Sequence, residues 1–176
     1  MQWINVNEDY LDFLRKSEPK IPHTNYENKY KPFFGVLFET ENLIYITQIS
    51  HPQKRHYNMK QQKDFYKIYD PNNIKRLIAV VNLNYMFPIP KSETSPFKKK
   101  DIEKYRAFRD STEKSKYLRL LDIELKEINK LNLSQAALNI YKFKYDFPDS
   151  CLSKRCIDFK HLEKIAIQFQ PTQYAP

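Results

Sequence analysis

The sequence predicts a single α+β domain in which an antiparallel sheet from the first half is covered by helices, mainly from the second half. Up to about residue 90, short runs with strand-like alternation are joined by short connections, as in antiparallel sheets. Beyond residue 100 the apolar spacing changes to about 3.6 residues, the period of an amphipathic helix. The 176 residues, 41% of them hydrophobic and 15% aromatic, suffice for one domain with a sizeable core, so we expect a single unit over residues 1–176.

The elements of the first half follow from this pattern. Residues 2–6 form a strand, and Asn7 caps a helix with an acidic first turn and Arg15 at its end, as the helix dipole favours. Residues 16–32 contain three prolines and form a long loop, which is either merely solvated or functional. A hairpin and two further strands follow, at residues 33–39, 43–49, 64–69 and 77–83, and the last continues through residues 85–87 until Pro88 and Pro90 end it.

The second half is helical. After a polar linker at residues 91–100, an amphipathic stripe begins at Ile102, and a break at Ser111 and Thr112 precedes a second helix with apolar positions from Tyr117 to Leu131. Asn132 or Ser134 caps a third helix that ends before Pro148, and a last helix covers residues 159–169. The apolar faces of these helices must lie on the sheet.

Composition limits the classes of function. A formal charge of +9 and a pI near 9.4 indicate a polyanionic partner, foremost nucleic acid, although a basic charge can also serve solubility alone. Cys151 and Cys156 lack the further ligands that structural zinc needs, and no apolar leader stands at residues 1–3, so we expect free thiols in a reducing cytoplasm. Gly35 is the only glycine, which excludes the usual nucleotide-binding turns, and no run is long enough to span a membrane.

The polar segment from Ser50 to His56 directly follows the hairpin and is the candidate active site. Cutting RNA without a metal requires a base for the ribose 2′-hydroxyl, positive charge near phosphorus and an acid for the leaving oxygen. Imidazoles suit proton transfer near neutral pH, which makes His51 the candidate base. Lys54 and Arg55 supply positive charge and Ser50 a hydroxyl. His56 either contributes to the site or bonds the backbone of its own loop.

Further residues are candidates for holding RNA. In the loop before the hairpin, aromatic and cationic residues alternate around Tyr26, Tyr30 and Lys31, a pattern suited to stacking bases and binding phosphates. Two basic runs elsewhere are either solvated helix faces or phosphate contacts beyond the catalytic centre. The RNA-binding candidates are therefore Tyr30, Arg55, His56, Lys98, Lys99, Lys100, Lys142 and Lys144.

Other kinds of function compete with metal-independent cleavage. No tight pair of carboxylates accompanies the two histidines of the loop, which argues against a metal centre, and no cofactor is expected. Ser50 lacks the glycine-flanked turn of a serine hydrolase. A non-catalytic, basic RNA-binding module remains the main alternative, and a structural or inhibitory protein partner is a third.

Several motifs, taken in order, resemble the toxin endoribonucleases of type III toxin–antitoxin systems, the ToxN and AbiQ family. The similarity is close over about residues 4–90 and holds only in outline beyond. It is carried by the helix Asp9-Tyr10-Leu11-Asp12-Phe13-Leu14, by Lys31-Pro32-Phe33-Phe34-Gly35-Val36, by Tyr45 with Ser50-His51-Pro52 through His56, by Met59-Lys60, and by the ending Val81-Asn82-Leu83-Asn84-Tyr85-Met86-Phe87-Pro88-Ile89-Pro90.

The resemblance implies a compact, highly twisted antiparallel sheet surrounded by helices. It implies an enzyme that cuts RNA without a metal and leaves a 2′,3′-cyclic phosphate. The implied partners are cellular or phage RNA substrates and a repetitive antitoxin RNA. The toxin processes this RNA, and each folded repeat then blocks it in a closed protein–RNA ring. Phage defence or plasmid maintenance is the implied role, in the cytoplasm.

The resemblance also assigns residues. The family lysine before the first hairpin strand falls on Lys31, and the basic residue of the active loop on Lys54 or its neighbour. The helix tyrosine falls on Tyr10 and the loop tyrosine on Tyr26. Where the family has a hydroxyl-hydroxyl-proline triplet, this chain has Ser50-His51-Pro52, which leaves either Ser50 or His51 at the position of the base. Tyr10 or Tyr26 would position the scissile phosphate, and Lys31 and Lys54 would stabilise the phosphorane.

Overall fold

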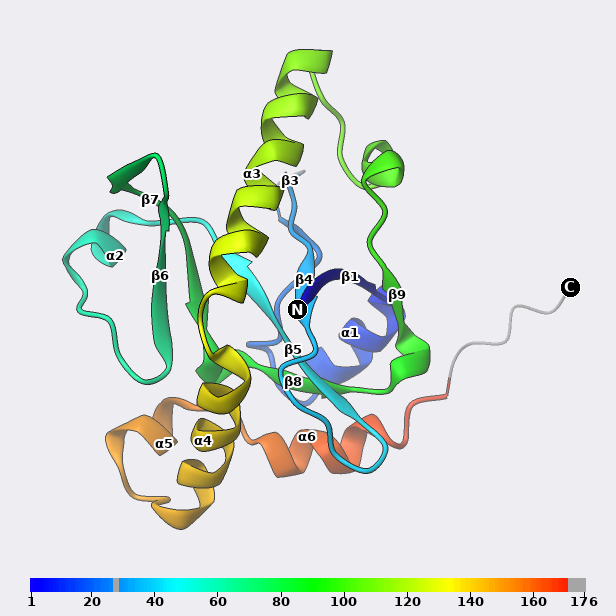
Figure 1. The fold of residues 1–176 in the computed structure, drawn as a ribbon. Coiled ribbons are helices and arrows are strands. Elements are labelled where there is room, and N and C mark those ends of the chain that lie inside the picture. Colours follow the sequence, from blue (N-terminus) through cyan, green and yellow to red (C-terminus); the bar gives the residue numbers. More distant parts are fainter. Residues whose placement is uncertain (27–28, 171–176) are drawn as a thin grey trace, which may run out of the picture.

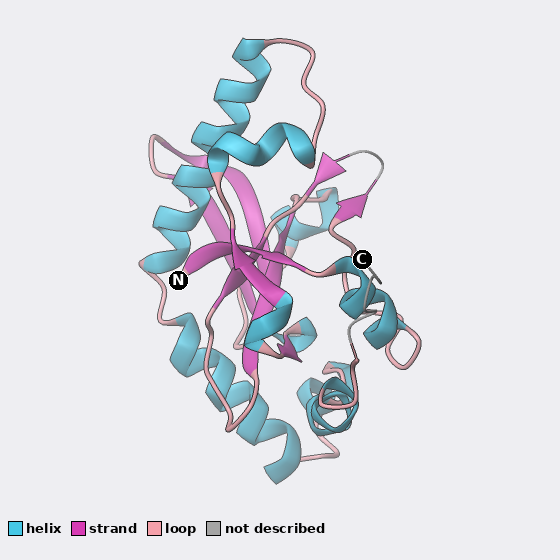
Figure 2. Cartoon of the chain, turned by 90° about the vertical axis from the view of Figure 1, so that its right-hand side faces the viewer, coloured by secondary structure: helices cyan, strands magenta, loops and turns pink. Residues whose placement is uncertain are grey.

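The computed structural model describes residues 1–26 and 29–170, without the side chains of residues 25, 26 and 29. A seven-stranded antiparallel sheet lies at its centre, in the order β6-β7-β5-β4-β1-β9, with β8 paired to β5 (Figure 1). Its strands are β1 (Gln2–Val6), β4 (Phe33–Gly35), β5 (Ile44–Ser50), β6 (Phe65–Asp70), β7 (Asn73–Asn82), β8 (Phe87–Ile89) and β9 (Thr94–Pro96). The helices surround the strands (Figure 2), which confirms the predicted α+β class.

Strand β5 is the hub of the sheet. It pairs with β4 through Phe33 opposite Gln48, with β8 through Ile44 opposite Ile89, and with β7 through Ile49 opposite Val81. Its residues from Ile44 to Thr47 are all buried, because they face packed helices or strands on both sides. The hydrophobic run after the predicted turn therefore becomes the central strand, and its carboxyl end delivers Ser50 and His51.

The predicted hairpin forms, but its first strand is shorter than expected. Regular pairing of β4 ends at Gly35, and two more bonds then hold the strands together, from Leu37 N to Tyr45 O and from Tyr45 N to Phe38 O, both 2.9 Å. A Cβ atom at Gly35 would lie 2.9 Å from Ile46 Cγ2, too close for ordinary packing. The single glycine thus lets β4 and β5 approach closely.

Most of the helices that pack around the sheet begin at a side-chain cap. The amide of Asp9 donates to Asn7 Oδ1 (3.0 Å) and that of Glu113 to Asp110 Oδ1 (2.7 Å), so the break predicted at Ser111 is an N-cap one residue earlier. The helices are α1 (Glu8–Arg15), α3 (Ser111–Asn129), α4 (Leu133–Asp146), α5 (Cys151–Arg155) and α6 (Phe159–Ala166). The 3₁₀ turns are η1 (Leu83–Tyr85), η2 (Lys91–Glu93) and η3 (Lys99–Lys104).

Several predicted boundaries were wrong. Residues 54–58 form a short helix, α2 (Lys54–Asn58), instead of an open loop, because Gln53 and His56 cap its first turn. The loop before the hairpin contains a small ladder of β2 (Asn25–Tyr26) and β3 (Lys29–Tyr30). The linker after Pro90 contributes edge strand β9 beside β1. The strand predicted through residue 87 is interrupted by η1 at residues 83–85, and Phe87 begins β8, which pairs with β5. A short helix over residues 151–155 was not predicted.

The main core draws side chains from both halves of the sequence. Trp3 of β1 donates its indole N–H to the carbonyl of Leu121 in α3 (3.1 Å), and Tyr45 of β5 lies edge-on to Tyr141 and Phe159 in the C-terminal helices. Both cysteines are free, as predicted, with Cys151 exposed and Cys156 buried. Within residues 1–26 and 29–170, no helix is long and apolar enough to cross a membrane.

Candidate active site

Helix α3 lies against the end of β5 and encloses a small cavity there. The chain before β4 contributes Lys31, the chain after β5 contributes His51, and α3 contributes Glu124. The space is about 10 Å³, too small for more than one water molecule, and its other walls are Tyr30, Pro32, Ile49, Tyr117, Leu120 and Leu121. The structure thus brings two of the predicted catalytic residues, Lys31 and His51, to one cavity.

Two tyrosines fix the backbone next to Lys31. The hydroxyl of Tyr117 donates to the carbonyl oxygen of Tyr30 (2.9 Å), and the Tyr30 hydroxyl donates to Asn5 Oδ1. The Tyr30 ring is stacked on Tyr105, with centroids 4.8 Å apart, and burial raises its pKa. Tyr30 was predicted to bind RNA. Its ring is only 1% exposed, so it supports Lys31 from within the protein and offers no surface for stacking.

Gln48 holds the same segment from the sheet side. Its side-chain amide donates to the carbonyl oxygens of Lys31 (2.8 Å) and His23 (3.0 Å). The backbone of Lys31 is therefore bonded to β5, which also carries His51. A phosphate that contacts both residues would meet groups on one rigid support.

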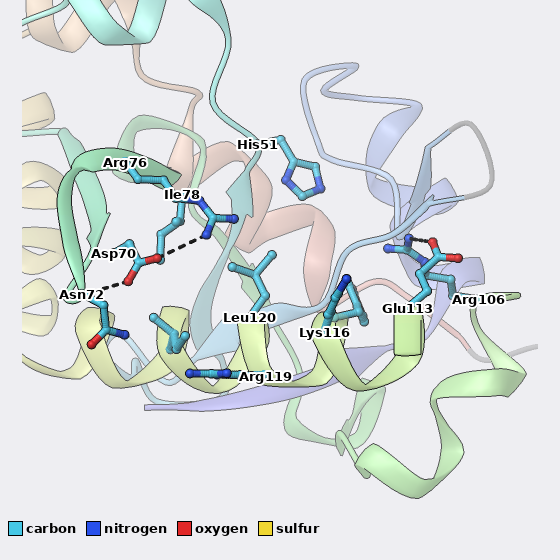
Figure 3. Close-up of a pocket in the computed structure, with 12 residues that line it drawn as sticks. His51, Asp70, Asn72, Arg76, Ile78, Arg106, Glu113, Lys116, Arg119 and Leu120 are labelled. Carbon is cyan, nitrogen blue, oxygen red and sulfur yellow. Dashed lines mark hydrogen bonds and ion pairs between the residues drawn. The ribbon is translucent and has the colours of Figure 1, made fainter. Parts of the chain in front are cut away.

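A larger groove runs along α3 from Arg106 and Glu113 to the β6–β7 hairpin, and His51 lies between its two ends (Figure 3). Its volume is about 750 Å³, and four basic side chains line it: Arg76, Arg106, Lys116 and Arg119. Two acids lie among them, with Asp70 Oδ2 3.3 Å from Arg76 and Glu113 Oε1 3.2 Å from Arg106. Lys116 and Arg119 are exposed, so the groove keeps a net positive charge beside His51.

Ser50 and His51 open onto different spaces, because neighbouring side chains of an extended chain point to opposite faces. His51 lines the cavity and the groove beside α3. Ser50 is half-buried and lines a separate hollow of about 180 Å³ together with Lys20, Pro22, Thr47, Gln48, Asn82 and Tyr85. Of the two residues that compete for the role of base, only His51 shares a cavity with Lys31.

Three predicted site residues serve structural contacts instead. Tyr10 has no exposed surface, and its hydroxyl donates to the carbonyl of Pro88 (2.7 Å). His56 is 4% exposed and its Nδ1 accepts from the Gln53 amide (3.1 Å), the bond to its own loop that was the alternative. Burial, with Arg55 and Lys67 nearby, lowers the pKa of His56. The Lys144 ammonium donates to two carbonyls at the end of α5, those of Ser153 and Cys156 (both 3.1 Å).

The other predicted residues lie on the surface or outside the described part. Lys54 and Arg55 are exposed at the start of α2, and Lys142 is exposed on α4. Lys98, Lys99 and Lys100 are exposed at η3, where Lys99 pairs with Asp122. None of these residues lines the cavity or the groove. The Tyr26 side chain lies outside the described residues.

Sequence reasoning missed Glu124 and the four basic residues of the groove. Glu124 is 1% exposed, and its Oε1 has no hydrogen-bond partner among the described residues. Burial raises the pKa of this carboxyl to about 8. A signal was present, because the spacing of Tyr117, Leu121, Glu124 and Ile128 puts an acid within the buried stripe of α3. Residues 1–26 and 29–170 bring no three His, Cys, Asp or Glu side chains together as a metal site.

Comparisons with solved structures support the fold. One structure, described as "A processed non-coding RNA regulates a bacterial antiviral system", superposes with a TM-score of 0.77 at 18% identity, over 96% of this chain and 99% of the other. A second is that of AbiQ, "a lactococcal anti-phage endoribonuclease belonging to the type-III toxin-antitoxin system", with a TM-score of 0.73 at 20% identity, over 94% of this chain and 95% of the other.

Sequence comparisons define the family. "Endoribonuclease ToxN" from Pectobacterium atrosepticum is 26% identical over 99 residues, 54% of this chain and 57% of that protein. The protein of the same name from Bacillus thuringiensis subsp. kurstaki is 26% identical over 88 residues, 50% of this chain and 43% of the other. The matched segments thus span about half the length of these curated relatives. A family model described as "Toxin ToxN, type III toxin-antitoxin system" matches residues 2–167, so the chain belongs to the ToxN toxin family.

Proposed function

We propose that this protein is an endoribonuclease toxin that cuts RNA by attack of a ribose 2′-hydroxyl on the adjacent phosphodiester. The observation that carries the proposal is the shared cavity of Lys31 and His51, which opens beside a basic groove of about 750 Å³. The family match and the endoribonuclease names of two relatives support the same activity.

The roles of the residues follow from their chemistry. The imidazole of His51 takes the proton of the 2′-hydroxyl, because a neutral imidazole accepts protons readily near pH 7. The 2′-oxygen forms a bond to phosphorus while the bond to the 5′-oxygen breaks. The departing 5′-oxygen takes up one proton from water, and His51 gives the proton it has taken back to water, so that the products are a 2′,3′-cyclic phosphate and a 5′-hydroxyl. Lys31 stabilises the negative charge that builds up on the phosphorane oxygens. No step of this scheme requires a metal ion.

The groove beside α3 offers a path for the RNA backbone. Lys116 and Arg119 are exposed there, three residues apart, so both project from one side of the helix. Phosphates that follow this side would pass His51, which lies between the two ends of the groove (Figure 3). Such contacts are independent of sequence and give binding that weakens as salt rises.

An antitoxin RNA is the partner that this activity requires. We propose that the toxin processes a repetitive antitoxin RNA and that each folded repeat then occupies the groove, in a closed protein–RNA assembly within the cytoplasm. One similar structure is described as showing "selective toxin inhibition by a non-coding RNA pseudoknot", with a TM-score of 0.73 at 19% identity. Defence against phage or plasmid maintenance is the corresponding role. A tandem-repeat RNA encoded next to this gene should neutralise the toxin when both are expressed together.

The cleavage proposal is tested with purified protein and a labelled RNA in the presence of EDTA. The wild type should produce fragments with a 2′,3′-cyclic phosphate end. His51→Ala and Lys31→Ala should each reduce the cleavage rate at least about a hundredfold, the usual contribution of a general base or of one charge-stabilising group. His161→Ala and Lys164→Ala, on exposed positions of α6, are matched controls that should keep full activity.

The same variants distinguish the enzyme from a non-catalytic RNA-binding module. His51→Ala should still bind RNA while it no longer cuts it. If the wild type binds RNA but leaves it intact, the binding module is the correct reading. If both His51→Ala and Lys31→Ala cut RNA at the wild-type rate, the assignment of the site is wrong. Ser50→Ala should retain activity, because Ser50 opens onto the other hollow.

A further inference from the structure

Glu124 is the one acidic side chain among the residues that line the cavity of Lys31 and His51. It projects from the middle of α3 and is 1% exposed. A carboxylate at this place would put a negative charge against a site that has to receive a phosphate. The protonation state of Glu124 therefore matters for the proposed reaction.

The surroundings of Glu124 favour its neutral form. Its Oε1 has no hydrogen-bond partner among the described residues, and an ionised carboxylate without such partners is costly inside a protein. Desolvation raises the pKa of Glu124 to about 8, so the carboxyl carries its proton at neutral pH.

The titratable groups that line the cavity with Glu124 come from several elements. Lys31 precedes β4, His51 follows β5, Tyr30 belongs to β3 and Tyr117 lies two turns earlier on α3. Burial raises the pKa of both tyrosines, that of Tyr117 to about 12, so both stay neutral over the range in which Glu124 titrates. Glu124 is thus the only residue of the lining that can add a negative charge there between pH 6 and 9.

We propose that Glu124 is a positioning residue of the toxin, which in its protonated form keeps the wall behind Lys31 and His51 free of negative charge and so allows an RNA phosphate to bind beside these two residues. Ionisation of Glu124 places a carboxylate in the wall of the same cavity and weakens binding of the phosphate. This inference rests on the proposed RNA cleavage. It assigns a role to Glu124, whose charge affects how strongly the phosphate is bound. It follows that binding of the phosphate weakens at alkaline pH, because Glu124 on α3 becomes ionised there.

The test measures binding of a short 2′-O-methyl RNA, which cannot be cut by 2′-hydroxyl attack, from pH 6 to 9.5 at constant salt. The dissociation constant of the wild type should rise on the order of tenfold across this range, as expected for one added charge near the phosphate in a partly buried site. Glu124→Gln keeps the shape of the side chain without its charge and should lose most of this rise. Glu124→Met serves the same purpose if the glutamine variant does not fold.

Glu127→Gln is the matched control. Glu127 lies one turn further along α3, pairs with Lys130 and does not line the cavity, so its removal should leave the pH dependence of RNA binding unchanged. In cleavage of unmodified RNA, the KM of the wild type should rise in the same way between pH 6 and 9.5. The KM of Glu124→Gln should show no such rise.

The outcomes separate the inference from the proposed function. If the wild type binds and cuts RNA, but wild type and Glu124→Gln share one pH dependence of binding, the role of Glu124 is refuted while the ribonuclease stands. If the wild type does not bind the RNA at any pH, the proposed function fails and this inference with it. The inference is supported if the dissociation constant rises with pH in the wild type but not in the glutamine or methionine variant.

Discussion

Replacing Glu124 by glutamine should change how the stability of the fold depends on pH. The carboxyl has an ordinary pKa near 4.5 in the unfolded chain, and burial raises it to about 8 in the folded protein. The folded state therefore holds a proton that the unfolded state loses between these values. The contribution of this carboxyl to the unfolding free energy is fully present below about pH 4.5 and is lost as the pH rises to about 8.

The magnitude follows from the size of the shift. Each pKa unit corresponds to about 1.4 kcal/mol, so a rise from 4.5 to about 8 removes up to about 5 kcal/mol of unfolding free energy once Glu124 is ionised. Small domains have only about 5–15 kcal/mol in total. The wild type should consequently become much easier to unfold above pH 8, whereas Glu124→Gln should not share this loss.

The assay is urea unfolding of wild type and variant at several pH values between 5 and 9. The quantity to compare is the difference between the two unfolding free energies, because contributions from other titrating groups cancel in it. This difference should move in favour of the glutamine variant as pH rises, while Glu127→Gln should show no such trend. A difference between wild type and Glu124→Gln that stays constant from pH 5 to 9 would refute the reasoning.

Two further predictions concern the hairpin and the groove. Gly35→Ala should lower the unfolding free energy by about 1–3 kcal/mol, because the new methyl group would lie 2.9 Å from Ile46 Cγ2, and unchanged urea unfolding would contradict this packing. Lys116→Ala and Arg119→Ala should each weaken RNA binding and lower the slope of log affinity against log salt by about one, as for the loss of one phosphate contact. Lys126→Ala is the control, because Lys126 is exposed on the same helix but does not line the groove, and an equal effect of all three changes would argue against the groove as the RNA path.

Local patterns predicted most of the fold. Asn7 was recognised as the cap of α1, and the alternation of apolar residues located β5 and β7 to within a few residues. These features depend on side chains close in sequence, so they can be read from the sequence itself. The short edge strand β9, which contains Pro96, was missed, because its pairing with β1 depends on residues about ninety positions away.

The site was predicted less completely. His51 and Lys31 were singled out from their residue types and from the resemblance, and both line one cavity. The residue type did not reveal that Tyr10 and Tyr30 are buried. A tyrosine hydroxyl can hydrogen-bond a group inside the protein, as both do here, just as it can bind a substrate. Whether Ser50 or His51 lies toward Lys31 depends on which side of β5 faces α3, and no property of the loop itself contains that information.

The cavity joins parts of the chain that are synthesised far apart in time. Lys31 and His51 are synthesised first, but the wall formed by α3 (Ser111–Asn129) follows only later in the chain. A growing polypeptide would thus lack this cavity until α3 has been synthesised. Under the proposed function, chain order alone would therefore delay RNA cleavage until α3 has closed the cavity over Lys31 and His51.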